Sequence, residues 1–237
     1  MQTIGLIGGV MWPSTAEYYR LINHAVARTL GGAASARLVL VSLNFKDVLD
    51  AARDEHSGKH ARLYVEAAHK LRLAGADFIV ICSNTGHRRA DEIEQGVGVQ
   101  VLHIADVTAK AVRAAGYRRI ALLGTAVTME APFVKGRLED CWGLDVAIPD
   151  PETCRRLDRM ITGDMAQGTF SPEARLFVLQ AIDRMHREHR VQATVLGCTE
   201  LPILLGEAAN LHPTFDTLRL HAEAAAERAL APQPTSP

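Results

Sequence analysis

Short apolar runs alternate with amphipathic stretches along the 237-residue chain. Thr3–Ile7, Arg37–Ser42 and Phe78–Cys82 are largely apolar and lack the alternation of a half-exposed strand, so they predict buried parallel strands. Between such runs, apolar residues recur at spacings of three and four, as in Glu17–Ala25, which predicts helices. The pattern predicts an α/β fold with short, mainly parallel sheets flanked by helices.

The same periodicities predict the other elements. Further strands are expected at Gln100–Ile104, Ile120–Leu123, Val146–Ile148, Thr194–Leu196 and up to Asp216. Helices are expected after the break Trp12-Pro13-Ser14, within 44–59, and at His60–Leu73, His87–Gln95, Val107–Ala115, Thr128–Leu138, Cys154–Met165, Pro172–His186, Leu201–Leu205 and Leu218–Leu230. We expect Asp106 to cap the helix that begins at Val107.

The two halves of the chain resemble each other. Ala76–Ser83 aligns with Val191–Cys198 at an offset of 115 (198 − 83), and Thr3–Gly9 aligns with Arg119–Thr125 at an offset of 116 (119 − 3). Near-constant offsets indicate a duplicated unit. We therefore expect two pseudo-symmetric α/β domains, residues 1–103 and 104–212. A C-terminal helix of about 213–230 should pack back on the first domain, and 231–237 should form a disordered tail.

Composition and charge narrow the functional classes. The chain is 48% apolar with a formal charge of −1, so it lacks the basic surface of a nucleic-acid-binding protein. No apolar run approaches the roughly 18 residues of a membrane helix. No signal peptide is visible at the N-terminus, so we expect a cytoplasmic protein. The four cysteines show no close-paired metal spacing, and we expect free thiols and no metal.

The chemistry is expected where polar residues follow buried strands. Ligands of open α/β sheets bind beyond the carboxyl ends of the strands, where Ser83, Cys198, Gly8-Gly9 and Gly124-Thr125 fall. If the halves are duplicated, Ser83 and Cys198 face each other across an interdomain cleft. Cys198 is either an acid/base group or a buried structural thiol, and the residues alone favour neither. We expect Cys82 to be a core residue and His87 to be structural.

The motifs resemble those of the aspartate/glutamate racemase superfamily. The similarity rests on Thr3–Gly9, Ser83-Asn84-Thr85-Gly86-His87, Leu122–Thr125 and Gly197-Cys198-Thr199-Glu200, and it covers nearly the whole chain. Trp12–Thr15, Tyr18–Asn23, Leu102–Asp106 and Phe215–Thr217 look like the branch of broad-specificity amino-acid racemases. The resemblance implies two similar α/β domains, a site in the interdomain cleft, a homodimer, and racemisation of an amino acid without pyridoxal phosphate or any other cofactor.

In that family two cysteines act on opposite faces of the substrate α-carbon, and the resemblance carries this role to Ser83 and Cys198. Ser83 stands where the family has a cysteine, as in the broad-specificity branch. The expected substrate contacts are Val10, Arg53, Ser83, Asn84, Thr85, Thr125, Thr199 and Glu200. Arg53 lies near the place of the arginine that holds a distal carboxylate in members with acidic substrates, although Asp50 would repel that carboxylate.

Three functions stay open at this point. The first is an amino-acid racemase or epimerase that uses Cys198 and Ser83. The second is a one-thiol decarboxylase or lyase of the same superfamily, in which Cys198 donates the proton. The third is a ligand-binding relative without turnover. All three imply a small-molecule partner, with neither nucleic acid nor membrane.

Overall fold

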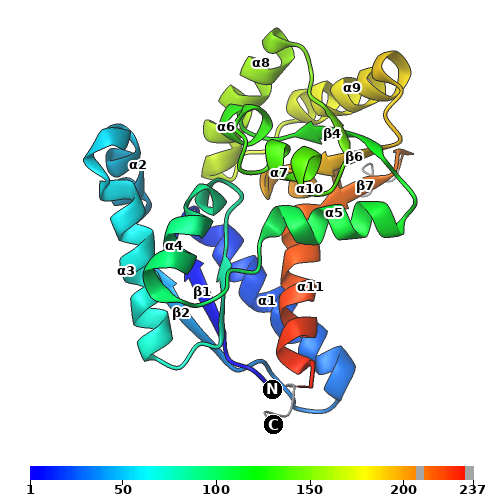
Figure 1. Cartoon of the computed structure of the whole chain (residues 1–237). Coiled ribbons are helices and arrows are strands. Elements are labelled where there is room, and N and C mark those ends of the chain that lie inside the picture. The colour runs from blue at the N-terminus through cyan, green and yellow to red at the C-terminus, as the bar shows by residue number, and fades with distance from the viewer. Residues whose placement is uncertain (207–210, 233–237) are drawn as a thin grey trace. The chain divides into compact units, whose positions relative to one another are not determined.

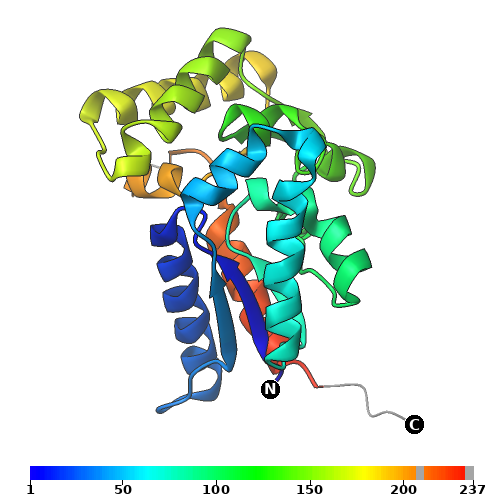
Figure 2. The same ribbon diagram turned by 90° about the vertical axis from the view of Figure 1, so that its left-hand side faces the viewer.

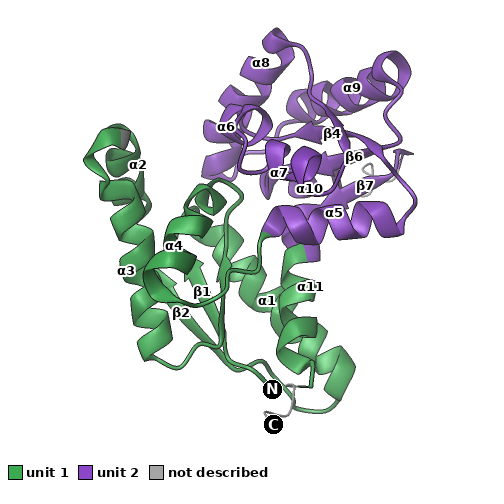
Figure 3. Cartoon of the chain, viewed as in Figure 1, with its two compact units in different colours: residues 1–103, 221–237 green, residues 104–220 purple. Residues whose placement is uncertain are grey.

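The computed structural model describes residues 1–206 and 211–232. The chain divides into two compact units, Met1–His103 with His221–Pro237, and Ile104–Leu220 (Figure 3). Within the described residues, no helix is long and apolar enough to cross a membrane. Most of the expected tail, residues 233–237, lies outside the described residues.

The first unit is a three-stranded parallel sheet with helices alongside it (Figure 1). Its elements are β1 (Ile4–Gly8), α1 (Trp12–Leu30), β2 (Leu38–Ser42), α2 (Phe45–Ala52), the 3-10 helix η1 (Glu55–Ser57), α3 (Lys59–Leu73), β3 (Phe78–Ile81), the 3-10 helix η2 (Thr85–Arg89), α4 (Ala90–Val97) and most of α11 (Thr217–Leu230). In Figures 1 and 2, α1 and α3 run beside the strands. β1 and β3 are wholly buried, which explains their continuous apolar sequence.

The second unit is a four-stranded parallel sheet. Its elements are α5 (Ile104–Ala114), β4 (Arg119–Leu123), α6 (Ala126–Glu130), α7 (Lys135–Asp140), β5 (Asp145–Ala147), α8 (Pro151–Thr162), the 3-10 helix η3 (Met165–Gln167), α9 (Pro172–His189), β6 (Ala193–Leu196), α10 (Glu200–Leu205) and β7 (Thr214–Asp216). One continuous core joins β4 and β6 to α5, α8 and α9. The predicted α/β class with two mainly parallel, helix-flanked sheets is confirmed.

The duplication inferred from the sequence is visible in the topology of the two sheets. Their strand orders are β2-β1-β3 and β5-β4-β6-β7, so the first strand of each unit is central. β3 ends at Ile81 and β6 ends at Leu196, an offset of 115 (196 − 81). In register, Ile7 pairs with Ile81 and Leu123 pairs with Leu196. Ser83 and Cys198 therefore occupy equivalent positions, each two residues beyond its strand.

Two expected elements differ from the prediction. Gln100–Ile104 makes only one isolated parallel bridge, between Val101 and Ile79, with hydrogen bonds from the Ile79 N–H to the Gln100 carbonyl and from the Leu102 N–H to the Ile79 carbonyl; α5 already begins at Ile104. Thr128–Leu138 is two helices, because Pro132 disfavours helical backbone at Ala131, which is extended.

The expected caps and boundaries also need correction. Trp12 and Pro13 belong to the first turn of α1, where a proline without an N–H is tolerated. Asp106 lies inside α5 and is not its cap; its carboxylate accepts hydrogen bonds from Arg137 and from Trp142 Nε1 at 2.8 Å. Within the predicted C-terminal segment of about 213–230, Thr214–Asp216 forms β7, which pairs with β6, and Thr217–Leu230 forms α11.

Candidate active site: two strand ends

Ser83 sits in the turn that leads from β3 into η2. Its Oγ accepts a hydrogen bond from the Gly86 N–H at 3.2 Å, and its carbonyl accepts one from His87 Nδ1–H at 2.8 Å. The side chain of Ser83 is partly exposed. The hydroxyl is therefore held in place by the backbone while it stays accessible at the end of the strand.

Cys82, one residue earlier, belongs to the core. It is 1% exposed, and burial raises the pKa of its thiol far above the usual value. Because its side chain is enclosed, the Cys82 thiol does not reach a ligand at the strand end, whereas Cys198 is partly exposed. The expected register, with Cys82 inward and Ser83 outward, matches this arrangement.

Two polar residues, Asn84 and Thr85, follow Ser83 at the start of η2. Asn84 is buried, and Thr85 is partly exposed. Both come from the same turn as Ser83, so this unit brings together the expected ligand contacts Ser83, Asn84 and Thr85.

The turn after β1 is built on glycine. Gly9 has φ +88°, and a Cβ at this position would lie 2.0 Å from the carbonyl oxygen of Leu43. The Gly9 N–H donates to Thr15 Oγ1 at 3.0 Å. Val10, an expected substrate contact, packs its side chain into the core of this unit.

Three buried histidines, His87, His103 and His221, pack against one another next to the Ser83 turn. The ring of His87 is centred 4.8 Å from His103 and 5.3 Å from His221. His221 Nε2–H donates to the Leu102 carbonyl at 2.7 Å, and Nδ1 accepts from the Tyr18 hydroxyl at 2.8 Å. Burial, and then the neighbouring His87, lower the pKa of His221 to about 3. His87 is 2% exposed, and its structural role stays a prediction.

In the second unit, Cys198 forms a dyad with Glu200. Its Sγ donates to Glu200 Oε2 at 2.5 Å, while the Thr199 hydroxyl donates to Glu200 Oε1 at 3.0 Å. Glu200 is 6% exposed. Burial, followed by the charge of Glu200, raises the pKa of Cys198 well above its usual value. Glu200 is one of the expected substrate contacts, and in this unit its carboxylate accepts hydrogen bonds from the Cys198 thiol and the Thr199 hydroxyl.

The dyad follows the end of β6, where the backbone of β6 lies close to that of β4. The Gly197 N–H donates to the Leu123 carbonyl at 2.7 Å, and a Cβ at Gly197 would lie 3.1 Å from that oxygen. Thr125 caps α6 at this edge: its Oγ1 lies 3.0 Å from Thr128 Oγ1 and accepts from the Thr128 N–H. Cys198, Thr199 and Thr125 thus all lie beyond the carboxyl ends of adjacent strands.

Asp158 supports the same edge and was not expected from the sequence. Its Oδ1 accepts from the Ala126 N–H at 2.9 Å, next to the Thr125 cap. Nothing in the local pattern distinguishes Asp158 from a solvated residue of α8, because its partner lies 32 positions away.

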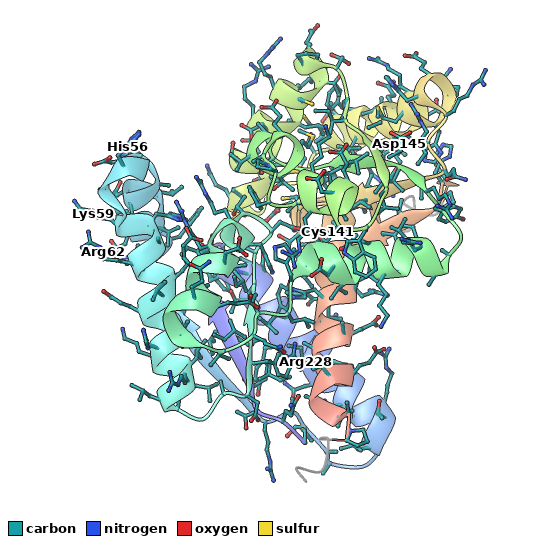
Figure 4. All side chains as sticks on the ribbon, in the orientation of Figure 1. His56, Lys59, Arg62, Cys141, Asp145 and Arg228 are labelled. Atoms are coloured by element: carbon teal, nitrogen blue, oxygen red, sulfur yellow. The ribbon has the colours of Figure 1, made fainter. Side chains whose placement is uncertain are left out.

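The Arg53 guanidinium is paired with a neighbouring carboxylate of the protein and is exposed to solvent. Its side chain is 80% exposed and pairs with Asp50 at 3.2 Å. Lys46 also bonds to Asp50, and this hydrogen bond is the main cause of the lowered pKa of Asp50. Figure 4 shows Lys59 and Arg62 extending from α3, where they line a surface cavity of about 500 Å³ together with Asp47, Asp50 and Glu66.

Among residues 1–206 and 211–232, no group of three or more His, Cys, Asp or Glu side chains is arranged to hold a metal ion. Cys141, labelled in Figure 4, is exposed, and Cys154 is buried with its thiol donating to the Pro149 carbonyl. The described cysteines are all free thiols.

The chain was compared with models of known protein families. Residues 7–225 match the Asp/Glu/hydantoin racemase family. The chain belongs to this family. The match spans both sheets and both strand-end motifs, so the resemblance read from the sequence is confirmed.

Solved structures agree with the assignment. The fold is similar to a crystal structure of a candidate Asp/Glu racemase from Yersinia pestis, with 39% identity over 98% of this chain and 100% of that chain, and a TM-score of 0.92. An aspartate racemase homologue from Pyrococcus horikoshii is 30% identical over 97% of this chain and 99% of that chain, with a TM-score of 0.83.

A curated relative is similar over a shorter stretch. The broad specificity amino-acid racemase RacX of Bacillus subtilis is 34% identical over 67 residues, which is 28% of this chain and 29% of RacX.

Proposed function

We propose that the protein is an amino-acid racemase or epimerase in which Cys198 and Ser83 exchange the α-proton on opposite faces of the substrate. The observation that carries the proposal is the hydrogen bond from the Cys198 thiol to the buried Glu200 carboxylate, at a strand end of a racemase-family chain. The proposed chemistry needs no pyridoxal phosphate. As the family resemblance implies, we also propose a cytoplasmic homodimer.

Glu200 supplies the basicity that the Cys198 thiol lacks. Because the pKa of Cys198 is raised, the thiol is protonated at neutral pH. When the thiol proton moves to Glu200 Oε2, the sulfur becomes a thiolate that can remove the α-proton. The dyad then holds two protons and no negative charge, and the charge resides on the substrate carbanion. This proton balance makes Glu200 a partner in the step, beyond its expected contact role.

The other face of the substrate has only a hydroxyl. Ser83 can donate its proton to the carbanion, but as a base it is far weaker than a thiolate. We therefore propose that proton transfer at Ser83 limits turnover. The direction that begins at Cys198 should have the higher kcat and a correspondingly higher KM, because the equilibrium constant fixes the ratio of the two kcat/KM values. Asn84, Thr85, Thr125 and Thr199 hold the α-carboxylate and stabilise the carbanion through preorganised hydrogen bonds.

We propose that the substrates are neutral or hydroxylated amino acids. The exposed ion pair of Arg53 with Asp50 leaves no dedicated cation on α2 for a second carboxylate. The similarity to the broad specificity racemase RacX agrees with a site that does not demand an acidic side chain.

The serine at position 83 favours one alternative, a decarboxylase or lyase with a single thiol. In that reaction Cys198 would protonate the enediolate left by loss of carbon dioxide, and no second base would be needed. This reaction requires only the proton that the Cys198–Glu200 dyad already holds.

Ser83→Cys tests the proposal against this alternative. In a racemase limited by its weak second base, the variant should raise kcat/KM by the same factor in both directions, and the kcat values of the two directions should become more alike. In a one-thiol lyase, the added thiol should instead erode the stereopurity of the product. A folded variant that is slower in both directions would contradict proton transfer on two faces.

A further inference from the structure

The proposed substrate carries an α-ammonium group, and the expected contacts of the second unit leave this group without an anion. Thr125 and Thr199 offer hydroxyls, which suit the α-carboxylate. Glu200 has a carboxylate, but it is 6% exposed, and its two oxygens accept hydrogen bonds from the Cys198 thiol and the Thr199 hydroxyl. A cation that leaves water for a binding site is stabilised by an opposite charge, so another carboxylate is needed at this edge of the sheet.

Asp158, on α8, supplies a carboxylate at this edge. Its side chain is partly exposed, and its Oδ1 accepts a hydrogen bond from the Ala126 N–H at 2.9 Å. Among residues 1–206 and 211–232, no side chain or backbone N–H donates to the second oxygen, Oδ2, and no cation is paired with it. One oxygen is therefore fixed by the backbone, and the other can accept a hydrogen bond from a ligand.

The turn that Asp158 holds packs against the residue that precedes Cys198. A Cβ at Gly124 would lie 3.1 Å from the carbonyl oxygen of Gly197, and a Cβ at Gly197 would lie 3.1 Å from Cγ2 of Thr128. The segment from β4 into α6 is thus in close contact with the end of β6. The Asp158 carboxylate and the Cys198 thiol lie on either side of this contact, within one unit.

A second carboxylate of this edge has a different task. Asp216 ends β7, the other neighbour of β6, and its Oδ1 accepts hydrogen bonds from the N–H groups of Leu218 and Arg219 at 3.0 and 3.1 Å. It caps the start of α11. Asp158 is therefore the carboxylate of this edge that has an oxygen to offer to a substrate.

We infer that Asp158 binds the α-ammonium group of the substrate through Oδ2, while Oδ1 keeps its bond to the Ala126 N–H. This role rests on the proposed racemase function. The ion pair favours the ammonium form of the amino group, whose positive charge makes the neighbouring α-C–H more acidic. A malonate has no ammonium group and would bring a second carboxylate toward Asp158, so this residue selects α-amino acids.

Asp158→Asn tests the contact, because asparagine keeps an oxygen for the Ala126 N–H but loses the charge. The value of kcat/KM should fall by about 10- to 100-fold, as expected for the loss of one charge-assisted hydrogen bond. The fall should be the same in both directions, because the equilibrium constant is fixed, and should appear mainly as a higher KM. Thermal unfolding checks the fold. A folded variant with unchanged KM would overturn the contact.

A substrate analogue gives a readout that a purely structural role would not move. Calorimetry compares the panel amino acid that exchanges fastest with its α-hydroxy analogue, in which a hydroxyl replaces the ammonium group. The parent should bind the amino acid at least about 10-fold more tightly, and Asp158→Asn should lose this preference. A preference that persists in the variant would show that Asp158 only supports the turn.

Glu152→Gln is the matched control. Glu152 is exposed on the same helix, and the substitution removes the same charge. It should leave KM and the preference for the amino acid unchanged, whereas an equal effect would assign the result to the general charge of α8 and overturn the contact. A parent protein that exchanges no α-proton would overturn the proposed function itself. Normal exchange with an unchanged KM in Asp158→Asn would overturn the ammonium contact alone.

Discussion

The Cys198 thiol donates a hydrogen bond to Glu200 Oε2 across 2.5 Å, and the second carboxylate oxygen accepts one from Thr199. Burial, and then the charge of the neighbouring Glu200 carboxylate, raise the pKa of Cys198. The proposed proton transfer depends on this dyad.

Glu200→Gln should change the pKa of Cys198 and the turnover rate in opposite ways: the thiol should ionise more easily, while the reaction should become slower. Removing the carboxylate charge should lower the pKa of Cys198, so alkylation of its thiol should begin at a lower pH. Turnover should nevertheless fall by about 100-fold or more, because the amide cannot accept the thiol proton. Alkylation against pH and racemisation rates check the two effects. A variant with unchanged turnover would remove Glu200 from the mechanism.

Cys198→Ala and Cys82→Ala should have opposite consequences. Without Cys198, α-proton exchange should fall by at least about 100-fold, with the fold intact. Cys82→Ala should keep exchange and lose stability on the order of 1 kcal/mol, because it leaves a small cavity in the core. Denaturant unfolding and exchange rates measured on both variants make the comparison. Loss of exchange in a folded Cys82→Ala protein would mean that the wrong residue has been placed at the strand end.

Neutral and hydroxylated amino acids should be better substrates than dicarboxylic acids. The physical reason is that Arg53 is exposed and engaged with Asp50, whose charge would repel a second carboxylate. Values of kcat/KM for serine, homoserine, methionine, aspartate and glutamate provide the measurement, with Arg53→Ala as the control. Higher values for the acidic pair, lost in Arg53→Ala, would show that Arg53 binds the side chain of the substrate.

Acid should destabilise the protein through His221. Its folded pKa of about 3 lies below the usual 6.5, so the unfolded chain binds a proton that the folded protein excludes. The contribution of the neutral ring is complete above about pH 6.5 and is lost as pH falls toward 3, by up to about 1.4 kcal/mol per pH unit.

His221→Gln checks this assignment. Glutamine offers one donor and one acceptor but does not titrate in this range, so the variant should be less stable at neutral pH and lose less stability toward pH 4. Urea unfolding at several pH values measures both slopes. Parallel slopes in the parent and the variant would assign the acid sensitivity to other groups.

The positions of Ser83 and Cys198 could be predicted from the sequence, because they follow from the apolar pattern of the strands and from the repeat. Buried strands must be apolar, and a duplicated unit repeats at a constant offset, so Ser83 and Cys198 could be placed at equivalent strand ends. The burial of Cys82 followed from the same register. These conclusions needed no long-range information beyond the repeat.

Contacts between residues far apart in the chain could not be predicted from the sequence. Asp106 has the composition of a helix cap, yet Arg137 and Trp142, more than 30 positions away, bind its carboxylate. The partner of Glu200 is only two positions away, but its orientation depends on the turn before α10.

Solvent-deuterium exchange tests the central claim most directly. A panel of single-enantiomer amino acids is incubated with the protein in deuterium oxide, and both the recovered substrate and any product are analysed for deuterium at the α-carbon. We predict deuterium in the product enantiomer and, with a slower appearance, in recovered substrate, with both lost in Cys198→Ala. Deuterium found only in a decarboxylated product, or in no compound of the panel, would contradict the racemase account.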